Sequence, residues 1–210
     1  YLDVLNGDIK YAELSKKAHS VRGKLIFDDK KVYYNKIIGY VGRSKVIPSG
    51  YTTLEGKSDV ILNIPDLDLK TGNELVQDSK LLVKLKKTLN FIDEISGTAN
   101  TVIHLWGTKN NLRSSGHLTI KDASLVYKDI SEKITNLTGR INFTEKDAFL
   151  DNLTGIVANS SLRVTGKVDN AKTIDILLSS DKLNLFQARK LIKNSPLLSE
   201  TETALKDYPE

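Results

Sequence analysis

Residues 134–143 read Ile-Thr-Asn-Leu-Thr-Gly-Arg-Ile-Asn-Phe, and apolar or small residues alternate with polar ones along this stretch. Residues 159–168, Asn-Ser-Ser-Leu-Arg-Val-Thr-Gly-Lys-Val, show the same period of two. Successive side chains of a strand point to opposite faces, so the pattern predicts strands with one apolar and one wet face. Short strands of this kind, separated by polar turns, favour antiparallel pairing. The sequence therefore predicts a mainly β fold with a few helices, in which an elongated antiparallel sheet curves.

The pattern occurs twice in the chain, at an offset of 116 residues (139 minus 23). Residues 1–70 align without a gap on residues 117–186. Three glycines coincide with three glycines at this offset: Gly23, Gly39 and Gly50 with Gly139, Gly155 and Gly166. Identical residues also coincide at Leu2, Tyr11, Ser15, Lys17, Phe27, Ser44, Asp59, Leu62, Leu67 and Leu69. Glycine within a strand often marks a bend, so the repeated glycines predict that the sheet curves there.

We divide the chain accordingly. Residues 1–70 form a first β repeat, residues 71–116 a helix and a connecting strand, residues 117–186 a second β repeat, and residues 187–210 a C-terminal helix and tail. The helix between the repeats is predicted over residues 74–95, where apolar residues recur at helical spacing. Thr71 or Asn73 is available as its N-cap and Gly97 as its stop. Residues 100–108 resume strand character, with Trp106 near the edge of the sheet, and residues 186–193 are again helical.

The composition is that of an ordinary soluble globular protein. Of the 210 residues, 40% are hydrophobic and 27% are charged, and there is no cysteine. No apolar run approaches the ~18 residues that a membrane-spanning helix needs. The net charge of +5 is spread along the chain among acidic residues; the locally basic residues 80–87 fit a solvated helix face better than a phosphate-binding patch. Because the chain starts within a strand and contains no methionine, we expect it to be a piece of a longer protein.

Motifs that carry chemistry are missing. His19, His104 and His117 share no metal-binding spacing, and Asp28-Asp29 is interpreted as a turn between strands. Residues 50–58 resemble a phosphate-binding loop, but the glycine spacing is wrong and a strand follows instead of the required helix. There is no aromatic cluster or arginine stripe typical of nucleic-acid binding. We therefore expect no enzyme activity, no cofactor, no metal and no nucleic-acid partner.

Three stretches of the second repeat carry a family resemblance. Residues 116–127, Gly-His-Leu-Thr-Ile-Lys-Asp-Ala-Ser-Leu-Val-Tyr, together with the two stretches quoted first, resemble the repeats of the AsmA-like superfamily, which includes the TamB- and YhdP-type envelope proteins. The first repeat joins this resemblance through its alignment with the second. The resemblance consists of glycines and alternating apolar residues and includes no catalytic motif.

The resemblance implies a function. Members of the superfamily are anchored in the inner membrane by an N-terminal helix and extend through the periplasm of diderm bacteria as a long curved sheet. It implies a periplasmic chain, tethered to the inner membrane through a segment outside this sequence and continuous with further repeats of the same protein. Its implied partners are phospholipid acyl chains, which an open apolar β-groove shelters on their way between the inner and outer membranes.

The residues lead to a similar expectation. A sheet with a continuous apolar face has to pack on a second layer or hold an apolar ligand. At ~0.8 kcal/mol per buried CH₂, a sixteen-carbon acyl chain gains on the order of 10 kcal/mol. The period of two predicts that the six groove candidates share one face: Leu137, Ile141, Phe143, Leu162, Val164 and Val168. Their polar neighbours are predicted to face water: Arg140, Asn142, Arg163 and Lys167. The alternative is a closed β-sandwich that serves as a spacer or as a binding or adhesion module, without a lipid conduit.

Overall fold

The fold is described from a computed structural model that defines residues 1–10, 15–78, 90, 92–108, 110–128, 132–169 and 174–182. Five strands precede the helix: β1 Leu2–Ile9, β2 Ala18–Phe27, β3 Lys31–Val41, β4 Ser44–Thr53 and β5 Lys57–Asp68. The helix α1 is Leu69–Asp78. Six strands follow it: β6 Ile92–Thr108, β7 Asn111–Tyr127, β8 Ile134–Phe143, β9 Asp147–Val157, β10 Ser160–Asp169 and β11 Ile174–Ser179.

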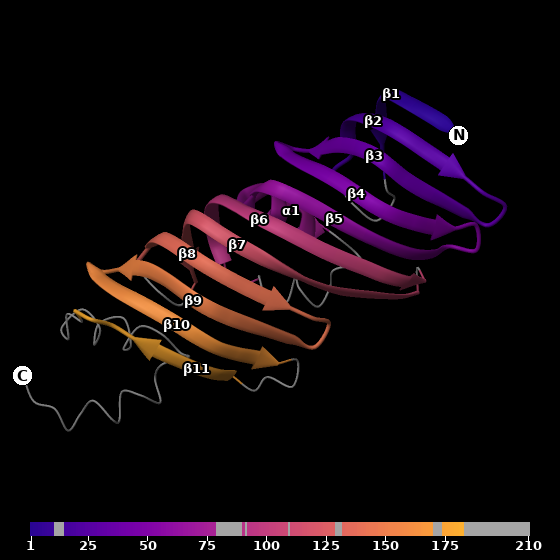
Figure 1. The fold of residues 1–210 in the computed structure, drawn as a ribbon. Coiled ribbons are helices and arrows are strands. Elements are labelled where there is room, and N and C mark those ends of the chain that lie inside the picture. The colour runs from indigo at the N-terminus through magenta and orange to yellow at the C-terminus, as the bar shows by residue number, and fades with distance from the viewer. Residues whose placement is uncertain are drawn as a thin grey trace, which may run out of the picture.

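The strands of the described residues belong to one antiparallel sheet, in which they lie side by side in the order of the sequence (Figure 1). The edge strands β1 and β11 lie at opposite ends, so the described part of the chain forms an open sheet. The mainly β, open, antiparallel architecture is therefore confirmed. A closed sandwich is wrong for the described residues, because they form a single sheet with no second sheet facing it.

Local irregularities bend this sheet. Register shifts interrupt the ladders between β2 and β3 and between β8 and β9. In β3, Lys36 has φ 52°, and its carbonyl oxygen lies 2.5 Å from the position that a Cβ at Gly23 would occupy. A bulge inserts an extra residue and increases the local bend and twist. Glycine at position 23 thus permits the bulged strand to approach its neighbour closely.

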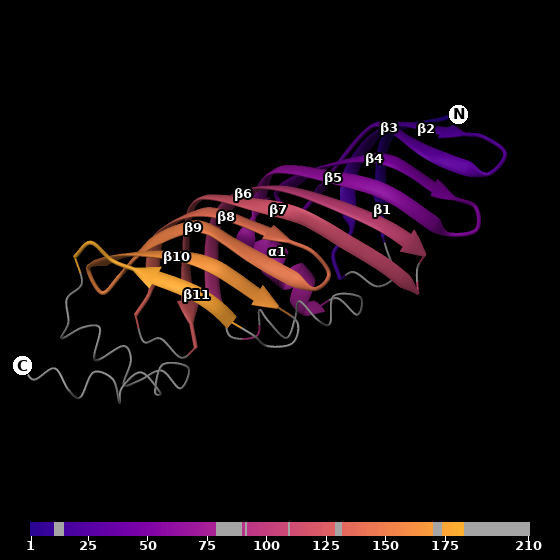
Figure 2. The same ribbon diagram turned by 60° about the horizontal axis from the view of Figure 1, so that its bottom comes forward.

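The core lies between the sheet and α1. Figure 2 shows the strands arching over α1, which lies on the inner side of the arch. Leu69 of the helix packs with Ala99, Ile120 and Ala123, of which Ala99 has no exposed surface at all. The small alanine side chains let the helix approach the strands closely.

A polar network fixes the start of α1. The backbone N–H of Thr71 donates to Oδ2 of Asp68 at 3.2 Å, which makes Asp68 the N-cap. The backbone N–H of Asp68 in turn donates to Oγ of the buried Ser44 at 2.9 Å. Farther along the helix, Glu74 accepts from Nζ of Lys16 at 2.5 Å. The helix is therefore anchored to β4 and to the segment before β2.

The sequence prediction for this helix was partly wrong. The helix begins at Leu69, so neither Thr71 nor Asn73 is its N-cap, and Gly97 lies within β6 instead of ending a helix. Residues 92–95 are strand, because Ile95 pairs with Leu125 of β7 and tertiary pairing outweighs helical spacing. Residues 79–89 lie outside the described residues, as does the predicted helix over 186–193. The described part contains one helix, where a few were expected.

Trp106 was also misplaced. We expected it near the edge of the sheet, but β6 is the sixth of eleven strands in the described part of the chain and pairs on both sides. The amino-acid sequence near a strand does not reveal how many strands lie beyond it.

Candidate functional site: the inner face of the sheet

The inner face of the sheet is defined as the face on which α1 lies. Directly paired residues of antiparallel strands have side chains on the same face, so the pairing carries this assignment from strand to strand. Ile120 contacts the helix cluster, and Leu118, two residues away, shares its face. From Leu118 the ladder runs through Ile141 and Leu150 to Gly166 and Ile176. The inner face therefore continues past α1 to β11.

The pairing puts all six groove candidates on the inner face. Each is half-buried and lies beside another inner-face residue: Leu137 beside Ala123, Ile141 beside Leu118, Phe143 beside Gly116, Leu162 beside Gly155, Val164 beside Leu153, and Val168 beside Ala148. Their polar neighbours alternate with them and lie on the outer face: Arg140, Asn142, Arg163 and Lys167.

The inner face is packed in one region and open in another. Leu137, Ile141 and Leu153 pack against the cluster beneath α1. Towards the β11 edge the same face is uncovered, since Ile176 is 41% exposed and Leu178 is 54% exposed. Because Leu178 lies beside Val164, the exposed region is continuous with the groove candidates on β10.

The sequence analysis missed exposed apolar residues of the inner face that precede the second repeat. Leu2 and Phe27 are about half exposed, and Leu112 is 43% exposed. The 116-residue offset offered a signal, because Leu2 and Phe27 correspond to Leu118 and the candidate Phe143. Between them, the hydroxyl groups of Tyr34, Thr52 and Ser58 form a hydrogen-bonded row of 2.9 and 3.1 Å. The apolar surface is therefore interrupted by polar groups in this part of the sheet.

The outer face carries polar and aromatic residues together with some exposed aliphatic ones, such as Ile26, Ile61 and Leu177. His104 Nε2 lies 2.8 Å from Oδ1 of Asp59, and its ring lies 4.7 Å from that of Trp106. His19 instead stacks on Tyr40, with ring centroids 5.9 Å apart. His117 belongs to β7 and lies beside Asn142 of β8. The three histidines thus lie apart, and the described residues contain no group of side chains that could hold a metal ion.

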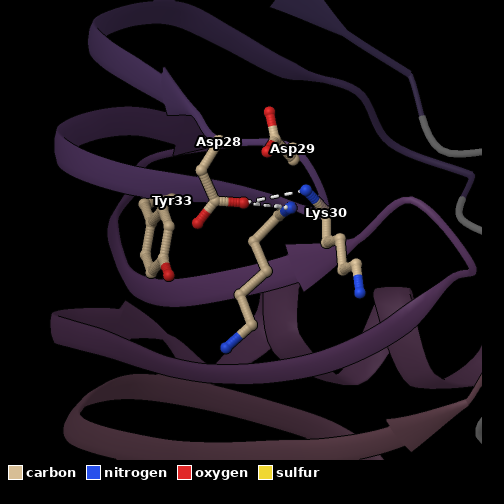
Figure 3. Close-up of a pocket in the computed structure, with 5 residues that line it drawn as sticks. Asp28, Asp29, Lys30 and Tyr33 are labelled. Carbon is tan, nitrogen blue, oxygen red and sulfur yellow. Dashed lines mark hydrogen bonds between the residues drawn. The ribbon is translucent and has the colours of Figure 1, made fainter.

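The two neighbouring aspartates lie in the turn between β2 and β3 (Figure 3). The Asp28 carboxylate accepts hydrogen bonds from the backbone N–H groups of Lys30 and Lys31, at 2.9 and 2.7 Å. The hydrogen bond from Lys30 is the largest cause of the lowered pKa of Asp28. In Figure 3 the Asp29 carboxyl group points away from that of Asp28, and with Tyr33 these residues line a shallow hollow. The geometry is that of a capped turn, as expected, and differs from a shared acid–base pair.

His117 is expected to titrate below 6.5. Desolvation, and to a smaller extent the positive charge of Arg140, lowers its pKa from that value. Since the folded state disfavours the proton, the contribution of this group to stability is present above pH 6.5 and is lost as the pH falls below it. An NMR titration should show the lowered pKa, and Arg140→Gln should raise it. Arg163→Gln, on β10 and three strands from His117, should leave this pKa unchanged; equal shifts in both variants would contradict the assignment.

Comparison with known proteins returned no match among family models, curated proteins or solved structures. Within the described residues, no helix has the length and apolar character required to cross a membrane.

Proposed function

We propose that the inner face shelters phospholipid acyl chains, and that the chain is a segment of a periplasmic AsmA-like protein that moves lipid between the inner and outer membranes. In this proposal, further repeats of the same protein extend the groove, and an anchor outside this sequence tethers it to the inner membrane. The open sheet carries the proposal, because its inner face stays apolar beyond the region that α1 covers. Contiguous exposed apolar surface is a feature of ligand-binding grooves and interaction sites.

We also propose that the sheet consists of two tandem repeats. The bounds of β2, β3 and β4, increased by 116, are the bounds of β8, β9 and β10. Unusual backbone angles follow the same offset: φ is 53° at Ser20 and 51° at Asn136, and 52° at Lys36 and 48° at Asn152. Positive φ is uncommon for residues other than glycine, so its recurrence at equivalent positions supports the repeat.

Contacts at the glycines support it as well. A Cβ at Gly139 would lie 2.5 Å from the carbonyl oxygen of Asn152, just as one at Gly23 would lie 2.5 Å from that of Lys36. The turns correspond too. Thr144 Oγ1 accepts from the backbone N–H of Asp147 at 3.1 Å, at the position where Asp28 accepts from Lys31.

The dimensions suit a lipid. Eleven strands spaced about 4.8 Å apart span roughly 50 Å along the sheet. A sixteen-carbon acyl chain is shorter than this and gains on the order of 10 kcal/mol when fully buried.

Adjacent leucines on β11 offer a matched test. Leu178 lies on the inner face beside Val164, whereas Leu177 lies beside Thr165 on the outer face, and both are more than half exposed. Leu178→Asp should weaken binding of a fluorescent phospholipid about tenfold or more, because it places a charge among acyl chains. Leu177→Asp introduces the same charge on the same edge strand and should leave binding nearly unchanged.

The measurement is a fluorescence titration of the purified chain, with circular dichroism to verify that both variants fold. Native mass spectrometry of the parent should detect co-purified phospholipid. Equal binding by the two folded variants, or no phospholipid binding by the parent, would reject the groove.

A further inference from the structure

The outer face of β2–β4 carries a group of basic and apolar residues, here named the basic outer patch: Arg22, Lys36, Ile38, Tyr40, Lys45 and Ile47. Arg22 lies beside Ile38, and Tyr40 lies beside Lys45, on directly paired positions. Lys36 is exposed at the β3 bulge, two residues before Ile38. Two further isoleucines of this face, Ile26 and Ile61, are 38% and 44% exposed. The patch thus combines cations with the half-buried Ile38, Tyr40 and Ile47, and the exposed Ile26 and Ile61 lie on the same face.

Within the described residues, the cations of the patch have no acidic partner. Asp3 lies 3.5 Å from Nζ of Lys24, and Asp8 is hydrogen-bonded to Lys17, so both nearby carboxylates already have a lysine partner. Among the ion pairs of the described residues, none includes Arg22, Lys36 or Lys45. A surface with this excess of positive charge attracts an anionic partner.

The equivalent surface of the second half differs. At the offset of 116, the six patch residues correspond to Thr138, Asn152, Thr154, Ile156, Ser161 and Arg163. The three cations of the patch are thereby replaced by neutral residues, and two isoleucines by Thr154 and Arg163. Strand pairing and turns are alike in the two halves, so the sheet itself does not require the basic and apolar residues of the first half.

We propose that the basic outer patch binds the surface of an anionic phospholipid bilayer. Lysine and arginine combined with tyrosine and exposed aliphatic side chains is the composition that anchors proteins at the membrane interface. Each basic residue near an anionic membrane surface contributes to binding. The patch is a broad face of three neighbouring strands, which suits a fluid surface better than the deep pockets that protein hot spots fill.

The ring contacts argue against a nucleic acid. Bases bind single-strand-binding proteins by stacking on open aromatic faces. Here the Tyr40 ring is stacked on His19, and the ring of the neighbouring Tyr51 is covered by Lys31 Nζ at 4.0 Å.

The comparison of the patch with its equivalent in the second half rests on the two tandem repeats proposed above. Bilayer binding by the outer face does not require lipid in the inner groove.

The test uses the whole chain and sedimentation with vesicles of phosphatidylcholine containing 30% phosphatidylglycerol. The triple variant Arg22→Thr, Lys36→Asn, Lys45→Ser gives each position the residue found at its equivalent in the second half. It should lower the partition coefficient on the order of 100-fold, since three cations are lost. Binding of the parent should fall with added salt and be weak on pure phosphatidylcholine.

A charge-matched control removes three exposed cations from the second half: Lys133→Ser, Lys146→Ser and Arg163→Ser. It should bind within about threefold of the parent, because these residues lie away from the patch. If the triple variant unfolds at a clearly lower temperature than the parent, the single variant Lys36→Asn is used in its place. Its partition coefficient should be about fivefold lower than that of the parent. Equal loss in the triple variant and the control would overturn the proposal, as would equal binding of the parent to anionic and neutral vesicles. The groove variant Leu178→Asp should still bind these vesicles, so failure of the groove and failure of the patch are distinguishable.

Discussion

Gly50→Ala should destabilise the sheet by more than about 3 kcal/mol, at the upper end of single substitutions. Gly50 has φ 117°, and a Cβ there would lie well inside van der Waals contact of the carbonyl oxygen of Asp59 on β5. The clash is with backbone, so no side-chain rotation relieves it, and β4 has to move away from β5. Urea unfolding followed by circular dichroism measures the loss.

Gly56→Ala is the control. Gly56 also has positive φ, 82°, but a Cβ there would meet nothing within 4 Å. Gly56→Ala should therefore lower the free energy of unfolding only by the cost of the backbone strain, about 1–2 kcal/mol. Similar losses of stability in the two variants would show that the close approach of β4 and β5 at Gly50 does not contribute to the effect of Gly50→Ala.

Ile141→Asp should also be strongly destabilising and should lower the free energy of unfolding by about 4 kcal/mol or more. Ile141 packs against the cluster formed by Leu69, Ala99 and Ile120, and an unpaired carboxylate there is heavily penalised. The variant should melt well below the parent in a thermal scan. This position consequently tests the packed part of the inner face, while Leu178 tests the open part.

Asn142→Asp, one residue along, provides the comparison. Asn142 lies on the outer face, where its side-chain oxygen accepts from Nε of Arg140 at 2.9 Å. An aspartate keeps that acceptor beside a cation, so stability should stay within about 0.5 kcal/mol of the parent. A comparable loss in both variants would mean that the two residues do not lie on opposite faces.

The strands of the second half were predictable from the sequence because their side chains alternate so regularly. Leu137, Ile141 and Phe143 lie on one face and Arg140 and Asn142 on the other, as the period of two requires. The strands of the first half then followed from the offset of 116. The openness of the sheet was predicted only from the family resemblance, because alternation reports which face is apolar and does not report what covers it.

The boundary between α1 and β6 could not be derived from spacing. Ile92 and Ile95 fit a helical pattern and a strand equally well, and only pairing with β7 decides between them. The start of α1 depends on Asp68 being held by Ser44, a residue 24 positions earlier. The bulges were equally hidden, since Lys36 has no intrinsic preference for positive φ and is forced there by its neighbours.

The strictly sequential strand order has a consequence for assembly of the fold. Each strand pairs with the strands that precede and follow it in the chain, so the sheet can form by successive local additions. Such topologies need few distant segments to meet at once, and each new strand is templated by the exposed backbone of the last. A polypeptide of this kind can acquire its structure vectorially, from one terminus to the other, as it emerges from a ribosome or a secretion channel.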